Sequence, residues 1–153
     1  MFRLSGKAIL RRWHGILNLP RQTPATWYRD RYNEELVEFH QANTFVERLS
    51  EQSDVFFAIS RAEYDGFPIE PLPQFRTRHL IVYAYMVAKY TSRWAFFRTV
   101  AVLCRAPRPS EVREVVNAGK DSKLAVVAGR HGVNAEKFTT VGRRLRRVWP
   151  LLP

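Results

Sequence analysis

The residues best suited to chemistry in this sequence form a run of arginines near the C-terminus. The run comprises Arg143, Arg144, Arg146 and Arg147, with Leu145 at its centre and Trp149 beyond it. A helix that carries four cations so closely spaced cannot enter an apolar core, because each unpaired charge would be too costly to bury. A phosphate-rich groove accepts such charges, since guanidinium groups bind phosphate in a bidentate manner. The run therefore predicts contact with nucleic acid, with Trp149 stacking or anchoring the tail; a solvated helix end is the alternative.

Six further basic residues complete the predicted RNA-binding set. They are Arg3, Lys7, Arg11, Arg12, Arg130 and Lys137. Arginine outnumbers lysine by twenty to five in the whole chain, which favours nucleic acid over simple surface charge because arginine also stacks on bases. A GC-rich genome is the alternative explanation of this ratio.

The charge of the chain is unevenly distributed along its 153 residues. The net charge is +11, with a pI near 10.5, which is typical of a protein that meets a polyanion. Residues 1–29 carry +6, residues 30–70 carry −7 and residues 71–153 carry +12. We expect the basic parts to face RNA and the acidic 30–70 region to face neighbouring proteins of a large complex.

The N-terminal segment has the pattern of an amphipathic helix from Met1 to Asn18. Its apolar residues recur at helical spacing and form one stripe: Ile9, Leu10, Trp13, Ile16 and Leu17. A second stripe carries Arg3, Lys7, Arg11 and His14. No acidic residue precedes Asp30, and an arginine-containing, acid-free amphipathic start is typical of mitochondrial targeting segments. The segment predicts a mitochondrial matrix location, whether it is cleaved or retained; a retained helix on RNA or lipid is the alternative.

Residues suited to catalysis are sparse. The four histidines lie far apart and lack metal-ligand spacing. The cluster of Glu34, Glu35 and Glu38 is interpreted as an exposed, solvated helical patch, and Cys104 as a packed core thiol. The chain has no phosphate-binding loop and no serine elbow. We expect no enzymatic activity, cofactor, metal or small-molecule substrate.

One segment resembles a known DNA-binding family. Val127 to Asn134, followed by Phe138 and Val141, resembles a helix-turn-helix. In that family a small residue on the first helix lets the second approach, and a glycine occupies the turn. Ala128, Gly132, Val133, Phe138 and Val141 match these positions. The resemblance implies DNA binding by residues 123–147; a plain helical hairpin is the alternative.

The elements that must position these residues are helical throughout. The hydrophobic periodicity predicts an all-α fold, a small helical bundle of five to seven helices with basic extended or helical termini. Predicted divisions are a basic N-terminal segment (1–22), a helical core (23–106) and a C-terminal helical hairpin with an arginine-rich last helix (107–153). The most hydrophobic stretch, residues 79–104, is interrupted by Lys89, Arg93 and Arg98, so we expect a core helix and no transmembrane span.

These patterns favour one function over two alternatives. The expected function is that of a structural RNA-binding component of a mitochondrial ribosome, neutralising rRNA phosphates and contacting neighbouring proteins. The first alternative is a mitochondrial assembly or adaptor protein that acts by protein–protein contacts at the inner membrane. The second alternative is a helix-turn-helix DNA-binding protein.

Overall fold

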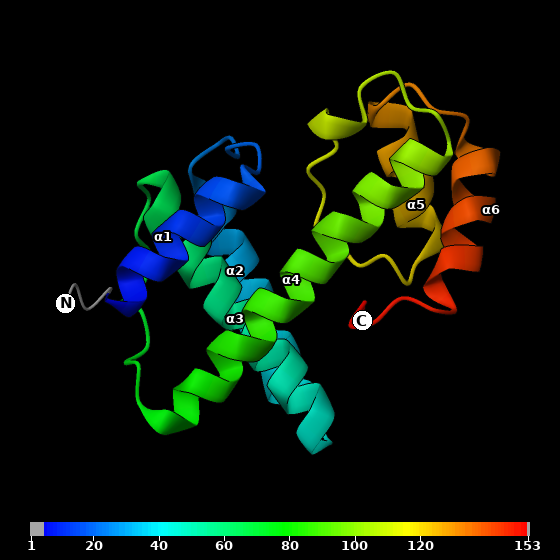
Figure 1. Cartoon of the computed structure of the whole chain (residues 1–153). Helices are drawn as coiled ribbons and strands as arrows, with labels where there is room; N and C mark the ends of the chain where they lie inside the picture. Colours follow the sequence, from blue (N-terminus) through cyan, green and yellow to red (C-terminus); the bar gives the residue numbers. More distant parts are fainter. Residues whose placement is uncertain (1–4, 153) are drawn as a thin grey trace. The chain divides into compact units, whose positions relative to one another are not determined.

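The computed structural model describes residues 5–152, and all the regular secondary structure in that range is helical (Figure 1). Six α-helices and one short 3-10 helix are present, and no strand is found among these residues. The predicted all-α fold is therefore confirmed. The chain forms two compact units, Met1–Val87 and Ala88–Pro153, and the boundary between them falls inside the long helix α4 (Thr77–Leu103).

Unit 1 is built from three helices and the first part of α4. They are α1 (Gly6–Leu17), α2 (Thr26–Gln41) and α3 (Phe45–Asp65). A capping box begins α3: the Thr44 side chain accepts a hydrogen bond from the backbone of Glu47, and the Glu47 side chain accepts one from the backbone of Thr44. Gly66 ends α3 with a φ of +85°, the left-handed conformation that glycine adopts most easily. The α2–α3 hairpin and the α1–α3 contact form the framework of this unit.

Helix α1 packs on α3 with a face that differs from the predicted stripe. Leu10, Trp13 and Leu17 are buried as expected, but His14 is buried with them, whereas Ile9 and Ile16 are exposed. The face is rotated because α3 offers His14 a partner: its Nε2 lies 3.0 Å from the Ser60 hydroxyl. The sequence placed His14 on a basic stripe beside the apolar one, whereas in the structure it belongs to the buried face.

Unit 2 contains the second part of α4 and the C-terminal elements. After α4 come the 3-10 helix η1 (Pro109–Glu111), helix α5 (Asp121–Arg130) and helix α6 (Ala135–Arg146). Asn134 caps α6 by accepting a hydrogen bond from the backbone of Lys137. The core of unit 2 joins α4, α5 and α6, with Phe96, Phe97, Leu124 and Phe138 completely buried.

Helix α4 is a core helix in unit 2, as the sequence predicted. Arg93 is buried, and its Nε donates a hydrogen bond of 2.8 Å to the carbonyl of Leu152, which holds the C-terminal segment against the helix. Arg98 donates to the carbonyls of Val112 and Ser110. Within residues 5–152, no helix combines the length and hydropathy needed to cross a bilayer.

Candidate nucleic-acid interface

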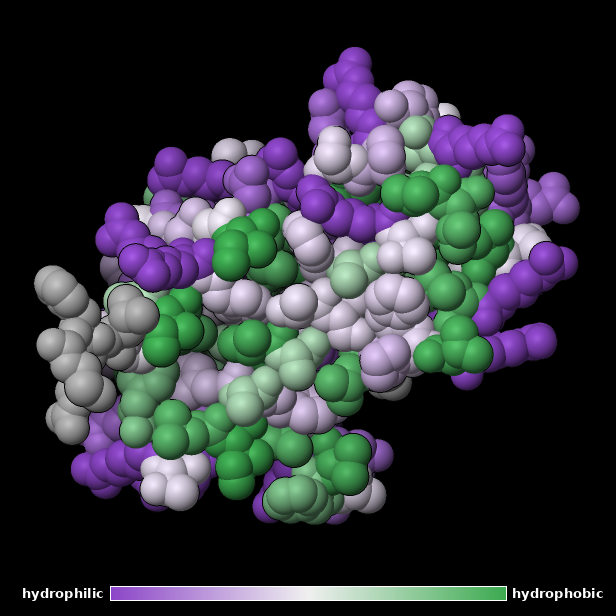
Figure 2. Space-filling view, viewed as in Figure 1, coloured by the Kyte–Doolittle hydropathy of each residue, from purple (hydrophilic) through white to green (hydrophobic). Residues whose placement is uncertain are grey.

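Unit 2 holds nearly all of the net charge of the protein. It contains fourteen basic and four acidic residues, so it carries +10 of the total +11. Figure 2 shows long hydrophilic side chains projecting from the part of the molecule that holds α5 and α6. A polyanion would therefore be drawn to unit 2.

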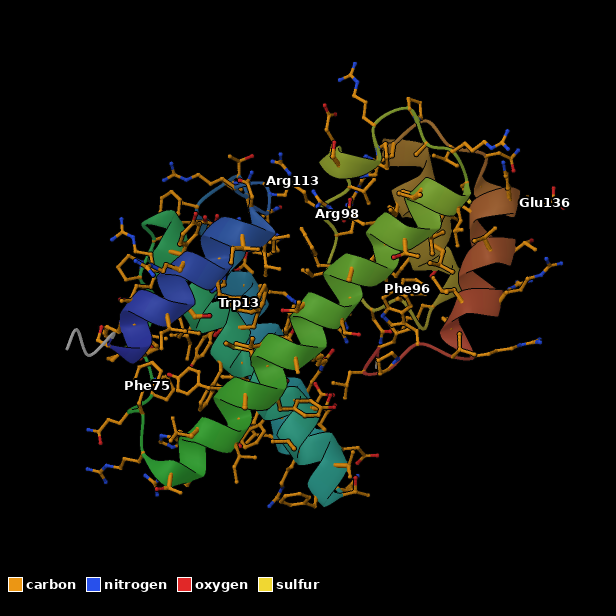
Figure 3. All side chains as sticks on the ribbon, viewed as in Figure 1. Trp13, Phe75, Phe96, Arg98, Arg113 and Glu136 are labelled. Atoms are coloured by element: carbon orange, nitrogen blue, oxygen red, sulfur yellow. The ribbon has the colours of Figure 1, made fainter. Side chains whose placement is uncertain are left out.

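The α5–α6 hairpin brings the arginine run to one end of this unit. Ala128 is completely buried, Gly132 has a φ of +65° in the turn, and Phe138 is completely buried in the core. Gly142 faces Leu124, and a Cβ atom at Gly142 would lie 2.9 Å from Cδ1 of that leucine, so a glycine here lets the two helices approach closely. Helices α5 and α6 form a helical hairpin, and the outer face of α6 is exposed; Figure 3 labels Glu136 on that face.

The structure divides the arginine run into two pairs with different contacts. Arg143 and Arg146 turn toward the start of α5, where both bind Asp121: the closest contacts are 2.5 Å to each of its carboxylate oxygens. Arg146 also donates to the carbonyls of Ala118 and Gly119. Hydrogen bonds, the stronger from Arg143 and the weaker from Arg146, hold the pKa of Asp121 below its usual range. Arg143 and Arg146 therefore fasten α6 to α5.

Arg144 and Arg147 form the second pair and point to solvent. Both are exposed, and their guanidinium groups have no ion-pair or hydrogen-bond partner among residues 5–152. Lys120 and Lys123 are also exposed and lie beside Asp121 in the chain, so they belong to the same end of the hairpin. We call this group the basic corner: Lys120, Lys123, Arg143, Arg144, Arg146 and Arg147. It contains six cations and one acid, Asp121.

Lys120 and Lys123 were not among the residues predicted from sequence. They lie twenty or more residues before the arginine run, and the packing of α5 on α6 brings them close to it. The clue available in the sequence was Asp121, a single acid between two lysines that could attract arginines from the next helix.

Trp149 anchors the C-terminal segment to α4. Its Nε1–H donates to the Ser92 carbonyl and lies at the same distance, 3.1 Å, from the Ser92 hydroxyl oxygen. Its ring packs edge-on against Phe96, which Figure 3 labels on α4, with 5.8 Å between the ring centroids. Of the two roles expected for Trp149, stacking or anchoring, the structure places it in the second.

Arg130 and Lys137 lie at the opposite end of the hairpin from the basic corner. Arg130 pairs with Glu114 at 3.2 Å, and Lys137 donates to the carbonyl of Cys104 at 3.3 Å. The ten residues from Lys137 to Arg147 span about 15 Å of helix. These two predicted residues are therefore separate from the arginine run and already occupied by intramolecular contacts.

The predicted N-terminal residues belong to unit 1. Lys7 pairs with Glu63 at 3.4 Å, while Arg11 and Arg12 are exposed on α1. Arg3 lies outside the described residues. Lys7, Arg11 and Arg12 are all exposed on α1, and Lys7 is the one of the three that pairs with an acid in the structure.

Two residues of chemical interest are buried. Cys104 is buried at the end of α4, and burial raises the pKa of its thiol while Lys137 opposes the shift, as expected for a packed core thiol. Glu35 is also buried, with its side chain 2% exposed, so the interpretation of Glu34, Glu35 and Glu38 as one solvated patch is wrong for Glu35. The packing of α2 on α3 covers it.

Comparisons with known proteins identify no relative. A scan against protein-family models found no match, and searches of curated proteins and of solved structures found no match either.

Proposed function

We propose that this protein is a non-catalytic, structural RNA-binding component of a mitochondrial ribosome, with the basic corner of unit 2 contacting rRNA phosphates. The observation that carries the proposal is the state of Arg144 and Arg147, which are exposed and unpaired beside two arginines that the fold already holds in place. A pair of free guanidinium groups on a fixed helix is suited to phosphate binding, because little further ordering is needed.

The ribosomal part of the proposal rests on charge distribution. Proteins that bind RNA mainly through phosphate gain affinity by releasing counterions and need no deep pocket. A basic unit joined to a unit of nearly balanced charge fits a protein that contacts RNA through the first unit and protein through the second. In unit 1, the acid-free helix α1 supports a mitochondrial location.

The test compares two double variants that remove the same charge. Arg144→Gln/Arg147→Gln removes the free pair, and Arg143→Gln/Arg146→Gln removes the pair bound to Asp121. We expect the first variant to keep the Tm of the wild type and to lose affinity for a structured RNA hairpin. Its slope of log K against log salt should flatten by about one to two units, since each lost phosphate contact changes that slope by about 0.7–0.9.

The second variant provides the control. We expect Arg143→Gln/Arg146→Gln to lower the Tm, because it removes the contacts that fasten α6 to α5. Identical salt slopes for the wild type and Arg144→Gln/Arg147→Gln would contradict RNA binding by the basic corner. Tighter binding of one duplex DNA sequence than of RNA would instead support the helix-turn-helix alternative, which the open outer face of α6 keeps as a candidate.

A second candidate function is that of an assembly or adaptor protein at the mitochondrial inner membrane. The specific observation is the outer surface of α1, where Ile9 and Ile16 are exposed next to Arg11 and Arg12, with no acid on the helix. Such a surface is suited to anionic lipid. Extraction with a respiratory complex, and not with ribosomal subunits, would favour this function.

A further inference from the structure

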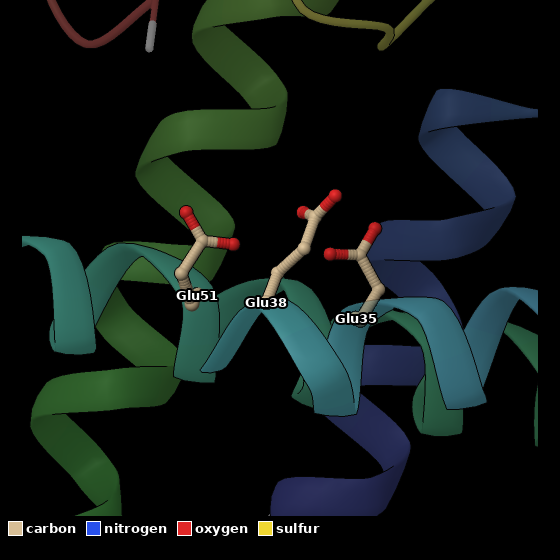
Figure 4. A group of neighbouring side chains, drawn as sticks. All are labelled: Glu35, Glu38 and Glu51. Carbon is tan, nitrogen blue, oxygen red and sulfur yellow. The ribbon is translucent and has the colours of Figure 1, made fainter. Parts of the chain in front are cut away.

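The α2–α3 hairpin of unit 1 brings three glutamates together around a buried oxygen atom. Glu35 and Glu38 lie one turn apart on α2, and Glu51 faces them from α3 (Figure 4). Each can offer a carboxylate oxygen such that all three oxygens lie within 4.8 Å of one another. Charges of one sign repel at such distances, and a cation bound among the three carboxylates would offset that repulsion.

The second observation concerns the bonding of Glu35 itself. One of its oxygens pairs with Arg31, whereas Oε2 is buried and has no hydrogen-bond partner among the described residues. An unpartnered buried carboxylate oxygen is costly. Figure 4 shows the Glu35 carboxylate lying beside that of Glu38, so the vacant bonding position belongs to the cluster.

We propose that Glu35, Glu38 and Glu51 bind one hard divalent cation, of the class of Mn²⁺, Mg²⁺ and Ca²⁺, at the α2–α3 hairpin. Carboxylate oxygens are the ligands that these ions prefer, and waters complete the coordination. Metal–oxygen distances of about 2.1–2.5 Å let one ion join oxygens somewhat over 4 Å apart.

The surrounding charges fit this assignment. Burial raises the pKa of Glu35 to about 7; the guanidinium of Arg31 opposes this shift, and the charges of Asp54, Glu38 and Glu51 add to it. Arg31 lies one turn before Glu35 on α2 and pairs with its Oε1, whereas Glu38 lies one turn after it, and a metal-ligating carboxylate is often supported by such a second partner. A bound cation would join α2 to α3 and stabilise the folded chain.

The experiment titrates the full chain with Mn²⁺, following the EPR signal of the free ion and the Tm of the protein. We expect one saturable site and a Tm that rises with Mn²⁺. Glu38→Gln should raise the dissociation constant by about tenfold or more, because removal of even an outer partner of a metal ligand costs tenfold. Glu51→Gln should have the same effect, and in both variants Mn²⁺ should no longer raise the Tm.

The matched control is Asp30→Asn, which removes one exposed acid from the same helix outside the cluster. It should bind Mn²⁺ as the wild type does. The proposal is overturned if the wild type shows no saturable binding up to about 1 mM Mn²⁺, the weakest range in which protein calcium sites work. It is equally overturned if Glu38→Gln and Asp30→Asn behave alike.

Discussion

His14 shows how one buried side chain makes stability depend on pH. Burial lowers its pKa to about 3, and the charge of Arg61 adds to the shift. Its Nδ1 has no hydrogen-bond partner among residues 5–152, so protonation of the folded chain would place an uncompensated charge in the core of unit 1.

We therefore expect the free energy of unfolding to decrease as the pH falls from about 6.5 toward 3. Below pH 6.5 the unfolded chain binds a proton at His14 that the folded chain excludes, and the slope for one group reaches about 1.4 kcal/mol per pH unit. Urea unfolding of the wild type and His14→Gln at several pH values measures this difference. A difference that stays constant across this pH range would show that His14 is not the titrating group.

The burial of individual residues was only partly predictable from the sequence. The periodicity of α1 identified Leu10, Trp13 and Leu17 as core residues, because they recur at helical spacing. It could not choose between Ile9 and His14 at the edges of the stripe, because that choice depends on Ser60, which lies 46 residues away in the chain. Glu35 was misplaced for the same reason, since the covering helix α3 is not visible in the sequence of α2.

Helix α6 has one face in the core of unit 2 and carries the arginines of the basic corner on the other. Mutations on the two faces should therefore change the stability of the protein by different amounts. Leu145 packs against the core of unit 2, whereas Val148, just after the helix, is 80% exposed. The existence, amphipathic pattern and cap of α6 could be predicted from local sequence. The pairing of Arg143 and Arg146 with Asp121 could not, because it depends on how α5 and α6 align across more than twenty residues.

We expect Leu145→Ala to destabilise the protein by about 1–3 kcal/mol, a cost at the lower end for large-to-small core substitutions because Leu145 is only partly buried. Val148→Ala should change the free energy of unfolding by less than about 0.5 kcal/mol, as exposed positions usually do. Chemical unfolding of both variants measures the difference. Equal costs at the two positions would mean that α6 does not pack through Leu145.

At the scale of the whole chain, the net charge is concentrated in one unit: unit 2 carries +10, and unit 1 is nearly neutral. The sequence alone showed basic ends and an acidic middle, and folding converts that pattern into one basic unit. This happens because the basic helix α1 packs on α3 within the acidic 30–70 region. The charge of α1 is thus largely cancelled within unit 1, while the charge of unit 2 remains available to a partner.

The packing of α1 leads to a prediction about import. Residues 1–30 fused to a cytosolic reporter should direct it to mitochondria, and the native protein should retain Leu10, Trp13 and Leu17, because these residues belong to the core of unit 1. Fluorescence microscopy tests the first expectation, and mass spectrometry of the N-terminal peptide tests the second. A reporter that stays cytosolic, or a native N-terminus beyond Leu17, would contradict the respective expectation.

If α1 is the targeting segment that we propose, its contact with α3 also determines when that segment can be recognised. In the folded protein Leu10, Trp13 and Leu17 of α1 are buried, and α1 packs on α3. Ile9 and Ile16, with Lys7, Arg11 and Arg12, remain accessible on α1. Recognition would have to occur on the nascent or unfolded chain, and folding of unit 1 after translocation would then conceal the signal and make delivery irreversible.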